Sequence, residues 1–228
     1  MVRGNLTAAL LFCCGAAVAG APPGRDFFPP PPGAVVDRQL VAFNGEGIAD
    51  RWPVILSKKQ VGTGNGHDFF QWYVSFYQLR RGAYRLRYES PGNGGPLSRV
   101  TQAGGGAKMW FPVQEVKIVG TAPLMRRGVQ QFVLMSHETA ADCGTAGVTV
   151  FASMPGATVG PAATLTNPCD LTARIGSDGT SLDLTGPYYG PNAPLCCPTK
   201  AKAAAVVRYR DGRWIETPHF FKLEMPAS

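Results

Sequence analysis

The chain has 228 residues, 45% of them hydrophobic, and its 22 Lys and Arg against 15 Asp and Glu give a formal charge of +7. This length suits one domain or two small ones and is ample for a hydrophobic core. After residue 19 no stretch is apolar and long enough for a membrane helix, so a transmembrane protein is not expected.

Residues 1–19 are typical of a secretory signal peptide. Arg3 precedes an apolar run that is too short to span a bilayer, and the run ends in AVA, which predicts cleavage between Ala19 and Gly20. We therefore expect an exported protein, periplasmic or secreted. Lipid anchoring is less favoured, because a large residue rather than a small one stands before Cys13, and Cys13 itself stands before Cys14.

Residues 20–34 form a proline-rich linker with the run PPPP at 29–32. Consecutive prolines favour polyproline II and lack backbone donors, so this arm is expected to stand off the domain. The folded part then begins near Val35 and continues as short strands separated by Gly and Pro.

The clearest hairpin pairs residues 69–79 with residues 83–89 across the turn RRG. Apolar and polar positions alternate along both segments, which is typical of strands buried on one side. The apolar positions are Phe70, Trp72, Val74 and Phe76 on the first segment, and Tyr84, Leu86 and Tyr88 on the second.

Further strands are predicted after a glycine-rich loop, in residues 113–122, 129–137, 147–153, 170–175 and 180–186. The last hairpin surrounds Asp211-Gly212, the strongest two-residue turn signal in the chain, because Asp and Gly tolerate the positive φ of a type I′ turn. The alanine-rich stretch 199–206 is compatible with a short helix, but a strand running into that turn is favoured.

These elements predict a mainly β fold of antiparallel sheets, as a sandwich, an open barrel or a partial propeller, with disulfide bonds in its C-terminal half. The predicted units are a signal peptide (1–19), a linker (20–34), an N-terminal β unit (35–104) and a C-terminal disulfide-containing β unit (105–228). The alternative is that 35–104 and 105–228 form one continuous domain.

Four cysteines remain after the signal peptide: Cys143, Cys169, Cys196 and Cys197. An even number in an exported chain predicts disulfide bonds. A bond between the two adjacent cysteines is the least favoured of three pairings, because its ring would be strained; two pairings stay open, each joining Cys143 and Cys169 to one member of the pair. No C-x-x-C motif or histidine spacing predicts a metal site, and no cofactor motif is present.

Catalytic signals are weak. Ser136-His137-Glu138 has the residue types of a triad, but adjacent strand residues point to opposite faces, and a G-x-S-x-G elbow is missing. His67, beside a glycine loop, offers a second position. A hydrolase acting on envelope or extracellular polymer, with a site near His67 or His137, is therefore the alternative hypothesis.

Two surface features favour binding instead. Basic pairs occur at turns, including Arg80-Arg81 and Arg126-Arg127, and would form a cationic rim if those turns meet. Phe69, Tyr73 and Tyr77 lie on the polar face of the first hairpin, where exposed rings would stack on sugars or anchor a protein, unless another segment covers them.

The segments ADCGTAGVTVF, NPCDL, LTGPYY and LCCPTKAKAAAVVRYRDGRW lie within residues 141–221. This region resembles uncharacterised secreted bacterial proteins with a Cys-Cys-Pro turn before a basic strand, and is similar to lipoproteins of the LppP/LprE type. The resemblance implies no activity. The main hypothesis is a non-catalytic binding or accessory module of the bacterial envelope; its partner would be an anionic polymer, a lipid headgroup, a carbohydrate or a protein, and not nucleic acid.

Overall fold

The computed structural model describes eleven stretches of the chain: residues 29–43, 51–64, 67–80, 82–90, 100–102, 108–110, 113–138, 145–154, 158–168, 170–194 and 197–224. Within them the regular elements are all β-strands, which confirms the mainly β prediction. No described segment is an apolar helix of membrane-spanning length. The signal peptide lies outside these residues.

The N-terminal sheet is an antiparallel meander of four strands in the order β1-β2-β3-β4. Its strands are β1 (Ala34–Ala42), β2 (Arg51–Gly64), β3 (His67–Arg80) and β4 (Ala83–Ser90). The predicted hairpin of residues 69–89 is thus confirmed as β3 and β4. The short strands β5 (Val100–Gln102) and β6 (Lys108–Trp110) pair only with each other among the described strands.

The central sheet has five strands in the order β15-β10-β9-β8-β7. They are β7 (Val113–Arg126), β8 (Val129–Glu138), β9 (Thr145–Met154), β10 (Thr158–Pro168) and β15 (Lys222–Glu224). Sequence patterns did not predict β10, because its segment TVGPAATLTNP contains Gly, two prolines and small residues that are typical of loops.

The C-terminal sheet has four strands in the order β11-β12-β13-β14. They are β11 (Thr172–Ile175), β12 (Ser181–Tyr188), β13 (Lys200–Arg210) and β14 (Arg213–Thr217). The alanine-rich stretch is part of strand β13, as favoured. The turn between β13 and β14 is also confirmed: Asp211 and Gly212 both have positive φ, 52° and 79°, as a type I′ turn requires.

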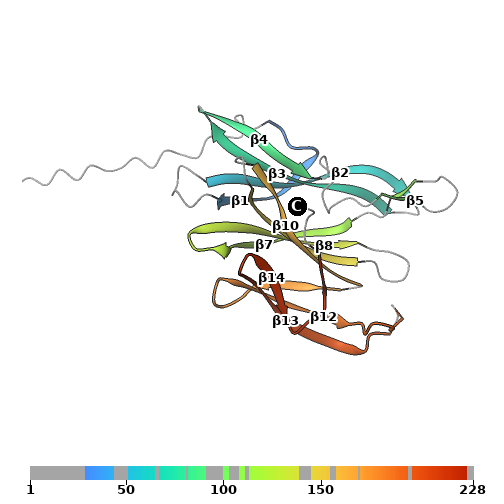
Figure 1. Ribbon diagram of the computed structural model, residues 1–228. Helices are drawn as coiled ribbons and strands as arrows, with labels where there is room; N and C mark the ends of the chain where they lie inside the picture. The colour runs from blue at the N-terminus through green and yellow to red at the C-terminus, as the bar shows by residue number, and fades with distance from the viewer. Residues whose placement is uncertain are drawn as a thin grey trace, which may run out of the picture.

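The three sheets stack as layers, with the central sheet between the other two (Figure 1). One apolar cluster fills the space between the N-terminal and central sheets, and includes Trp52, Phe76 and Phe151. A second cluster fills the space between the central and C-terminal sheets, and includes Val150 and Leu182. This is the face-to-face packing expected of a sandwich, extended by a third layer.

Burial on both faces explains why the central strands read as continuous apolar runs rather than alternating ones. In β8, Phe132 and Leu134 belong to the cluster shared with the N-terminal sheet, whereas Val133 belongs to the opposite cluster. The predicted boundary near residue 104 lies outside the described residues, and the division into two units stays a prediction.

Two expectations about the N-terminal sheet are wrong. Leu86 does not share the buried face with Tyr88: a bulge shifts the register between Phe76 and Tyr77, so Tyr88 faces the core while Leu86 is 43% exposed. The linker does not stand off the domain in its described part, since the Tyr77 hydroxyl donates a hydrogen bond to the carbonyl of Pro29 at 3.0 Å.

Candidate functional site

A hollow of about 640 Å³ opens where the ends of the central and C-terminal sheets meet. We call it the arginine hollow. Its lining comes from the end of β7 and the following turn, from the turn before β12 and from the end of β13. The lining residues are Pro123, Leu124, Met125, Arg126, Arg127, Asp178, Thr180, Arg208, Tyr209 and Arg210.

The first wall is the tip of the β7–β8 hairpin. The register of this hairpin slips between Ala122 and Arg126, so the intervening residues lack regular ladder partners. Gln131, which is only 2% exposed, takes the place of one missing backbone partner. Its side-chain oxygen accepts a hydrogen bond from the Met125 N–H at 2.9 Å. This contact holds the irregular segment in place and positions Arg126 and Arg127, which are both exposed.

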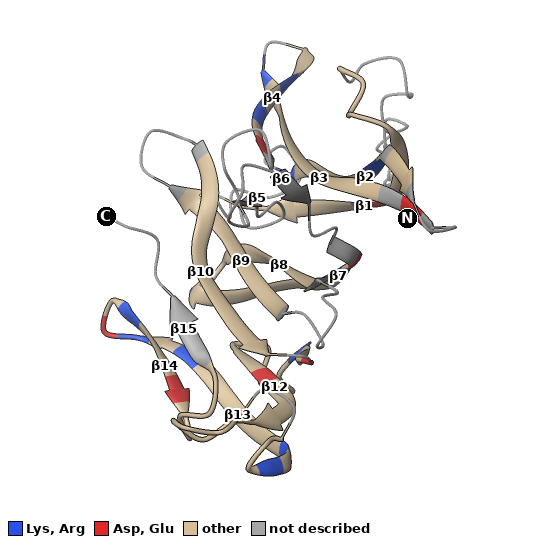
Figure 2. Cartoon of the chain, turned by 90° about the vertical axis from the view of Figure 1, so that its right-hand side faces the viewer, with Lys and Arg blue, Asp and Glu red and all other residues tan. Residues whose placement is uncertain are grey.

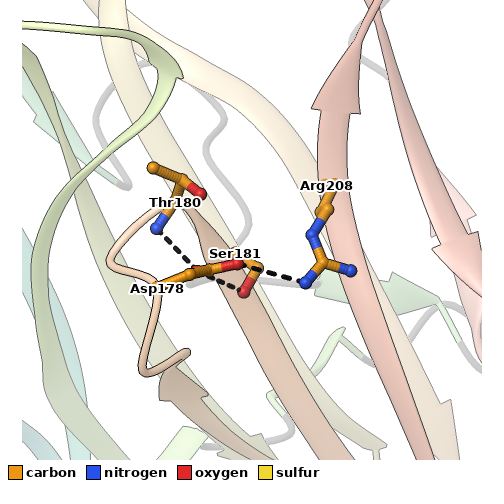
Figure 3. A network of polar contacts seen from close by, with 4 residues as sticks. All are labelled: Asp178, Thr180, Ser181 and Arg208. Carbon is orange, nitrogen blue, oxygen red and sulfur yellow. Dashed lines mark hydrogen bonds and ion pairs between the residues drawn. The ribbon is translucent and has the colours of Figure 1, made fainter.

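The second wall is the turn between β11 and β12, organised by the carboxylate of Asp178 (Figure 3). Asp178 Oδ1 accepts hydrogen bonds from the Thr180 N–H at 2.9 Å and from the Ser181 hydroxyl at 2.7 Å. Its Oδ2 lies 3.1 Å from Nη2 of Arg208. The Thr180 N–H, the Ser181 hydroxyl and then Arg208 hold the pKa of Asp178 well below its usual range, so this carboxylate stays charged.

The third wall is the end of β13. Arg208 and Arg210 alternate with Tyr209 along the strand, and all three line the hollow. The Tyr209 ring packs edge-on against Trp214 on β14, with 5.3 Å between ring centroids. The hollow therefore combines guanidinium groups with one aromatic ring, that of Tyr209, which packs against Trp214.

The lining of the hollow carries mostly positive charge. Four arginines and one aspartate give its lining a formal charge of +3. The single carboxylate is already bound to Arg208, and no ion pair with a described carboxylate involves Arg126, Arg127 or Arg210. Planar guanidinium groups bind phosphate, sulfate and carboxylate groups through paired hydrogen bonds, so this arrangement can hold an anion.

The structure separates the predicted basic pairs. Basic positions occur on β4 at one end of the molecule and along β13 and β14 at the other (Figure 2). Arg80 ends β3, and its Nε donates a hydrogen bond to Gln78, whereas Arg81 lies outside the described residues. Of the predicted pairs, the hollow includes only Arg126-Arg127; it adds Arg208 and Arg210, which sequence reasoning missed.

The predicted aromatic surface is wrong at Tyr77, which is only 1% exposed and bonded to the proline arm. Tyr73 is half-buried, and its hydroxyl donates a hydrogen bond to the side chain of Gln71. The Phe69 side chain lies outside the described part of the structure. The alternative, that another segment covers this face, is therefore confirmed for Tyr77.

The predicted cysteine and histidine sites are largely outside the described residues. Cys197 is exposed in the turn before β13, where its N–H donates to the carbonyl of Pro194; the other three cysteines of the predicted bonds lie outside the description. The His67 side chain is likewise not described, and His137 is half-buried on β8. Among described side chains, no three His, Cys, Asp or Glu gather into a metal site.

Comparisons with protein-family models, with curated proteins and with solved structures found no match. The resemblance of residues 141–221 to secreted bacterial proteins stays a prediction.

Proposed function

We propose that this protein is an exported, non-catalytic binding module of the bacterial envelope that holds an anionic ligand in the arginine hollow. The observation that carries the proposal is the gathering of Arg126, Arg127, Arg208 and Arg210 around one hollow with a single, already paired carboxylate. A phosphorylated or acidic polymer fits this site better than a small neutral ligand, because the hollow is open and its contacts are mainly charged.

The expected affinity follows from the exposure of the site. An exposed ion pair contributes about 0.2–1 kcal/mol, so one or two such contacts give weak binding and a polymer must engage several arginines at once. Removing Arg126 and Arg127 should then cost about 0.4–2 kcal/mol, which is about a 2- to 30-fold loss of affinity. Salt screens exposed charges, so the affinity should also fall steeply as ionic strength rises.

The test compares two double variants of equal charge. Arg126→Ala/Arg127→Ala removes two arginines from the hollow, and Arg38→Ala/Arg85→Ala removes two exposed arginines from the N-terminal sheet. Binding of labelled inorganic polyphosphate is measured by fluorescence anisotropy at low and high salt. We expect the first variant to lose affinity and the second to bind like the unmodified protein.

Equal losses in the two double variants would show that only net charge matters, and would remove the proposal of a specific site. Absence of binding by the unmodified protein at low salt would refute the proposal that the ligand is anionic. A response to Arg126→Ala/Arg127→Ala that is unchanged at high salt would contradict the electrostatic reasoning.

Disulfide bonds are a second part of this proposal. In an oxidising compartment, Cys143 and Cys169 would each pair with one of Cys196 and Cys197, and each bond would close a loop that is worth about 3–4 kcal/mol. Peptide mapping of exported protein without reduction tests this pairing; four free thiols in that material would overturn it.

The hydrolase hypothesis has no described site to support it. Ser136 and His137 occupy adjacent positions of β8, so their side chains point to opposite faces of the strand. It stays a prediction, to be tested by release of soluble fragments from envelope polymer, with His67→Ala and His137→Ala as the decisive variants.

A further inference from the structure

The exposed apolar side chains of this protein gather on one sheet. In the described part of the chain, the large hydrophobic side chains that are exposed are Val35, Val36, Leu40, Leu79 and Leu86. All of them belong to strands β1, β3 or β4 of the N-terminal sheet. A single exposed leucine is normal on a protein surface, whereas a group of them on one sheet marks a contact surface.

Two of the leucines lie at the end of the β3–β4 hairpin, which we call the hairpin tip (residues 78–87). Leu86 on β4 lies opposite Tyr77 on β3. Leu79 lies opposite Tyr84, and it follows Tyr77 by two positions, so both pairs share the face that is turned away from the core. Leu79 is 45% exposed and Leu86 is 43% exposed, and Tyr84 is partly exposed beside them. This face of the tip is therefore apolar.

The charge of the hairpin tip is entirely positive. Its sequence, QLRRGAYRLR, contains four arginines and no acidic residue. Arg80 and Arg85 are exposed, and each is next to a leucine in the sequence, so they point to the opposite face of the hairpin. No ion pair with a described carboxylate involves either arginine. The tip is thus an amphipathic hairpin, with leucines on one face and free positive charge on the other.

Two further arginines border the apolar face on the neighbouring strands. The strand registers continue this face across β2 to β1, where Leu40 is 54% exposed. Arg38 lies two residues before Leu40 and so shares the face. Arg51 shares it too, because it lies opposite Ala42, two residues after Leu40. Both arginines are exposed, so the whole apolar face is surrounded by positive charge.

The hairpin tip also stands at the outside of the molecule. Figure 2 shows the end of the β3–β4 hairpin projecting at the top, beyond the central and C-terminal sheets, with basic positions along it. Figure 1 shows the same sheet as the outermost layer on that side. A flat surface can therefore meet the tip without touching the other two sheets.

We propose that the hairpin tip docks this protein on the surface of an anionic lipid bilayer, with Leu79, Tyr84 and Leu86 in the headgroup boundary and Arg80 and Arg85 on lipid phosphates. Segments that lie at a bilayer surface combine buried apolar area with attraction to anionic lipids. Tyrosine is common at this boundary because its ring is apolar and its hydroxyl is polar. Arginine has a long side chain that reaches the headgroups while its stem lies on apolar surface.

This surface is separate from the arginine hollow. The hollow takes its positive charge from the central and C-terminal sheets, whereas the tip belongs to the N-terminal sheet. A soluble polyanion has no apolar phase, so it gains nothing from the leucines of the tip. Lipid vesicles engage the leucines and the arginines together.

The test measures co-sedimentation of the full-length protein with vesicles of phosphatidylglycerol and phosphatidylcholine in equal amounts, or of phosphatidylcholine alone. One arginine near an anionic membrane contributes about 5-fold to binding, so Arg80→Ala/Arg85→Ala should bind the mixed vesicles about 25-fold more weakly. Leu79→Ser/Leu86→Ser keeps the charge and should bind about 10-fold more weakly or worse, because the apolar contact is lost. Arg126→Ala/Arg127→Ala removes the same charge from the hollow and should bind like the unmodified protein. Phosphatidylcholine alone should bind least.

Several outcomes would overturn the proposal. Equal weakening by Arg80→Ala/Arg85→Ala and by Arg126→Ala/Arg127→Ala would mean that only net charge matters. Unchanged binding of Leu79→Ser/Leu86→Ser would rule out a contact with the apolar boundary. Tight binding to soluble polyglutamate with none to the mixed vesicles would assign the tip to an acidic protein instead. The exposure of all four positions means that these variants should keep the denaturation midpoint of the unmodified protein.

A second measurement separates insertion from adsorption by charge. Leu86→Trp places an indole at the tip, and mixed vesicles with brominated acyl chains should quench its added fluorescence. The same vesicles should leave the emission of the unmodified protein nearly unchanged, because Trp52 and Trp72 are only 1% and 6% exposed. Equal quenching of the two proteins would overturn insertion of the tip. Neither measurement depends on the arginine hollow, so failure here leaves the proposed function intact.

Discussion

Replacing Phe151 by Ala tests whether the stacked sheets unfold as one cooperative unit. Phe151 is fully buried on β9, and its ring centroid lies 5.1 Å from that of Phe76, 5.8 Å from Tyr88 and 6.3 Å from Phe132. Two of these three rings belong to the N-terminal sheet and one to the central sheet. A buried Phe→Ala change typically costs about 3–5 kcal/mol, from lost burial and from the cavity left behind.

The assay is urea denaturation followed by both tryptophan fluorescence and far-UV circular dichroism. Leu182→Ala is the matched variant, because Leu182 is equally buried on the other side of the central sheet and should cost about 2–5 kcal/mol. Val36→Ala is the surface control, since Val36 is 47% exposed, and it should change stability by less than about 0.5 kcal/mol.

If the layers fold as one unit, Phe151→Ala and Leu182→Ala shift the same single transition by similar amounts. Two separate transitions, only one of which responds to Leu182→Ala, would instead support the predicted division into an N-terminal unit (35–104) and a C-terminal unit (105–228) that contains both residues. A loss below about 1 kcal/mol for Phe151→Ala would refute the reasoning, because it would mean that this ring is not packed between two sheets.

Three further predictions concern ionisable groups. Folding should depress the pKa of Asp178 below 3.8. The Asp178 carboxylate therefore contributes to stability above pH 3.8, and this contribution is lost as the pH falls through the pKa of the folded state. A carboxyl NMR titration with Asp178→Asn as control measures this shift. Burial raises the pKa of Tyr77 above 10.0. The neutral phenol therefore contributes to stability below pH 10, and this contribution is lost as the pH rises through the pKa of the folded state. Tyrosinate absorbance, compared with that of Tyr77→Phe, measures this shift. Glu216, 2% exposed, accepts hydrogen bonds from the N–H groups of Phe220 and Phe221, so Glu216→Ala should lower the free energy of unfolding by about 1–3 kcal/mol, and an unchanged denaturation midpoint would contradict this.

Local chemistry explains which elements were predictable. The Asp211-Gly212 turn depends on two residues that tolerate positive φ, and the β3–β4 hairpin depends on a short turn between alternating segments. Each of these signals is contained within a few neighbouring residues of the chain. The strand β10 and the bulge that exposes Leu86 carry no such local signal, so they were missed.

The arginine hollow shows the same limit at the level of the site. Arg126-Arg127 stood out as an adjacent pair beside a turn, but Arg208 and Arg210 alternate in a strand and resemble ordinary surface positions. They become part of one site only because the tip of the β7–β8 hairpin meets the end of β13. Likewise, the sequence predicts an exposed Tyr77, whereas the structure buries its side chain and bonds its hydroxyl to the Pro29 carbonyl.

By itself, the sequence determined that this chain forms antiparallel strands, where the clearest turns lie, and that its surface carries an excess of positive charge. Only the tertiary structure decided which faces are buried, that the central sheet packs against apolar clusters on both of its faces, and which arginines meet. The physical reason is that strand alternation and turn propensity act over neighbouring residues, whereas register, bulges and layer packing are set by contacts between residues far apart in the chain.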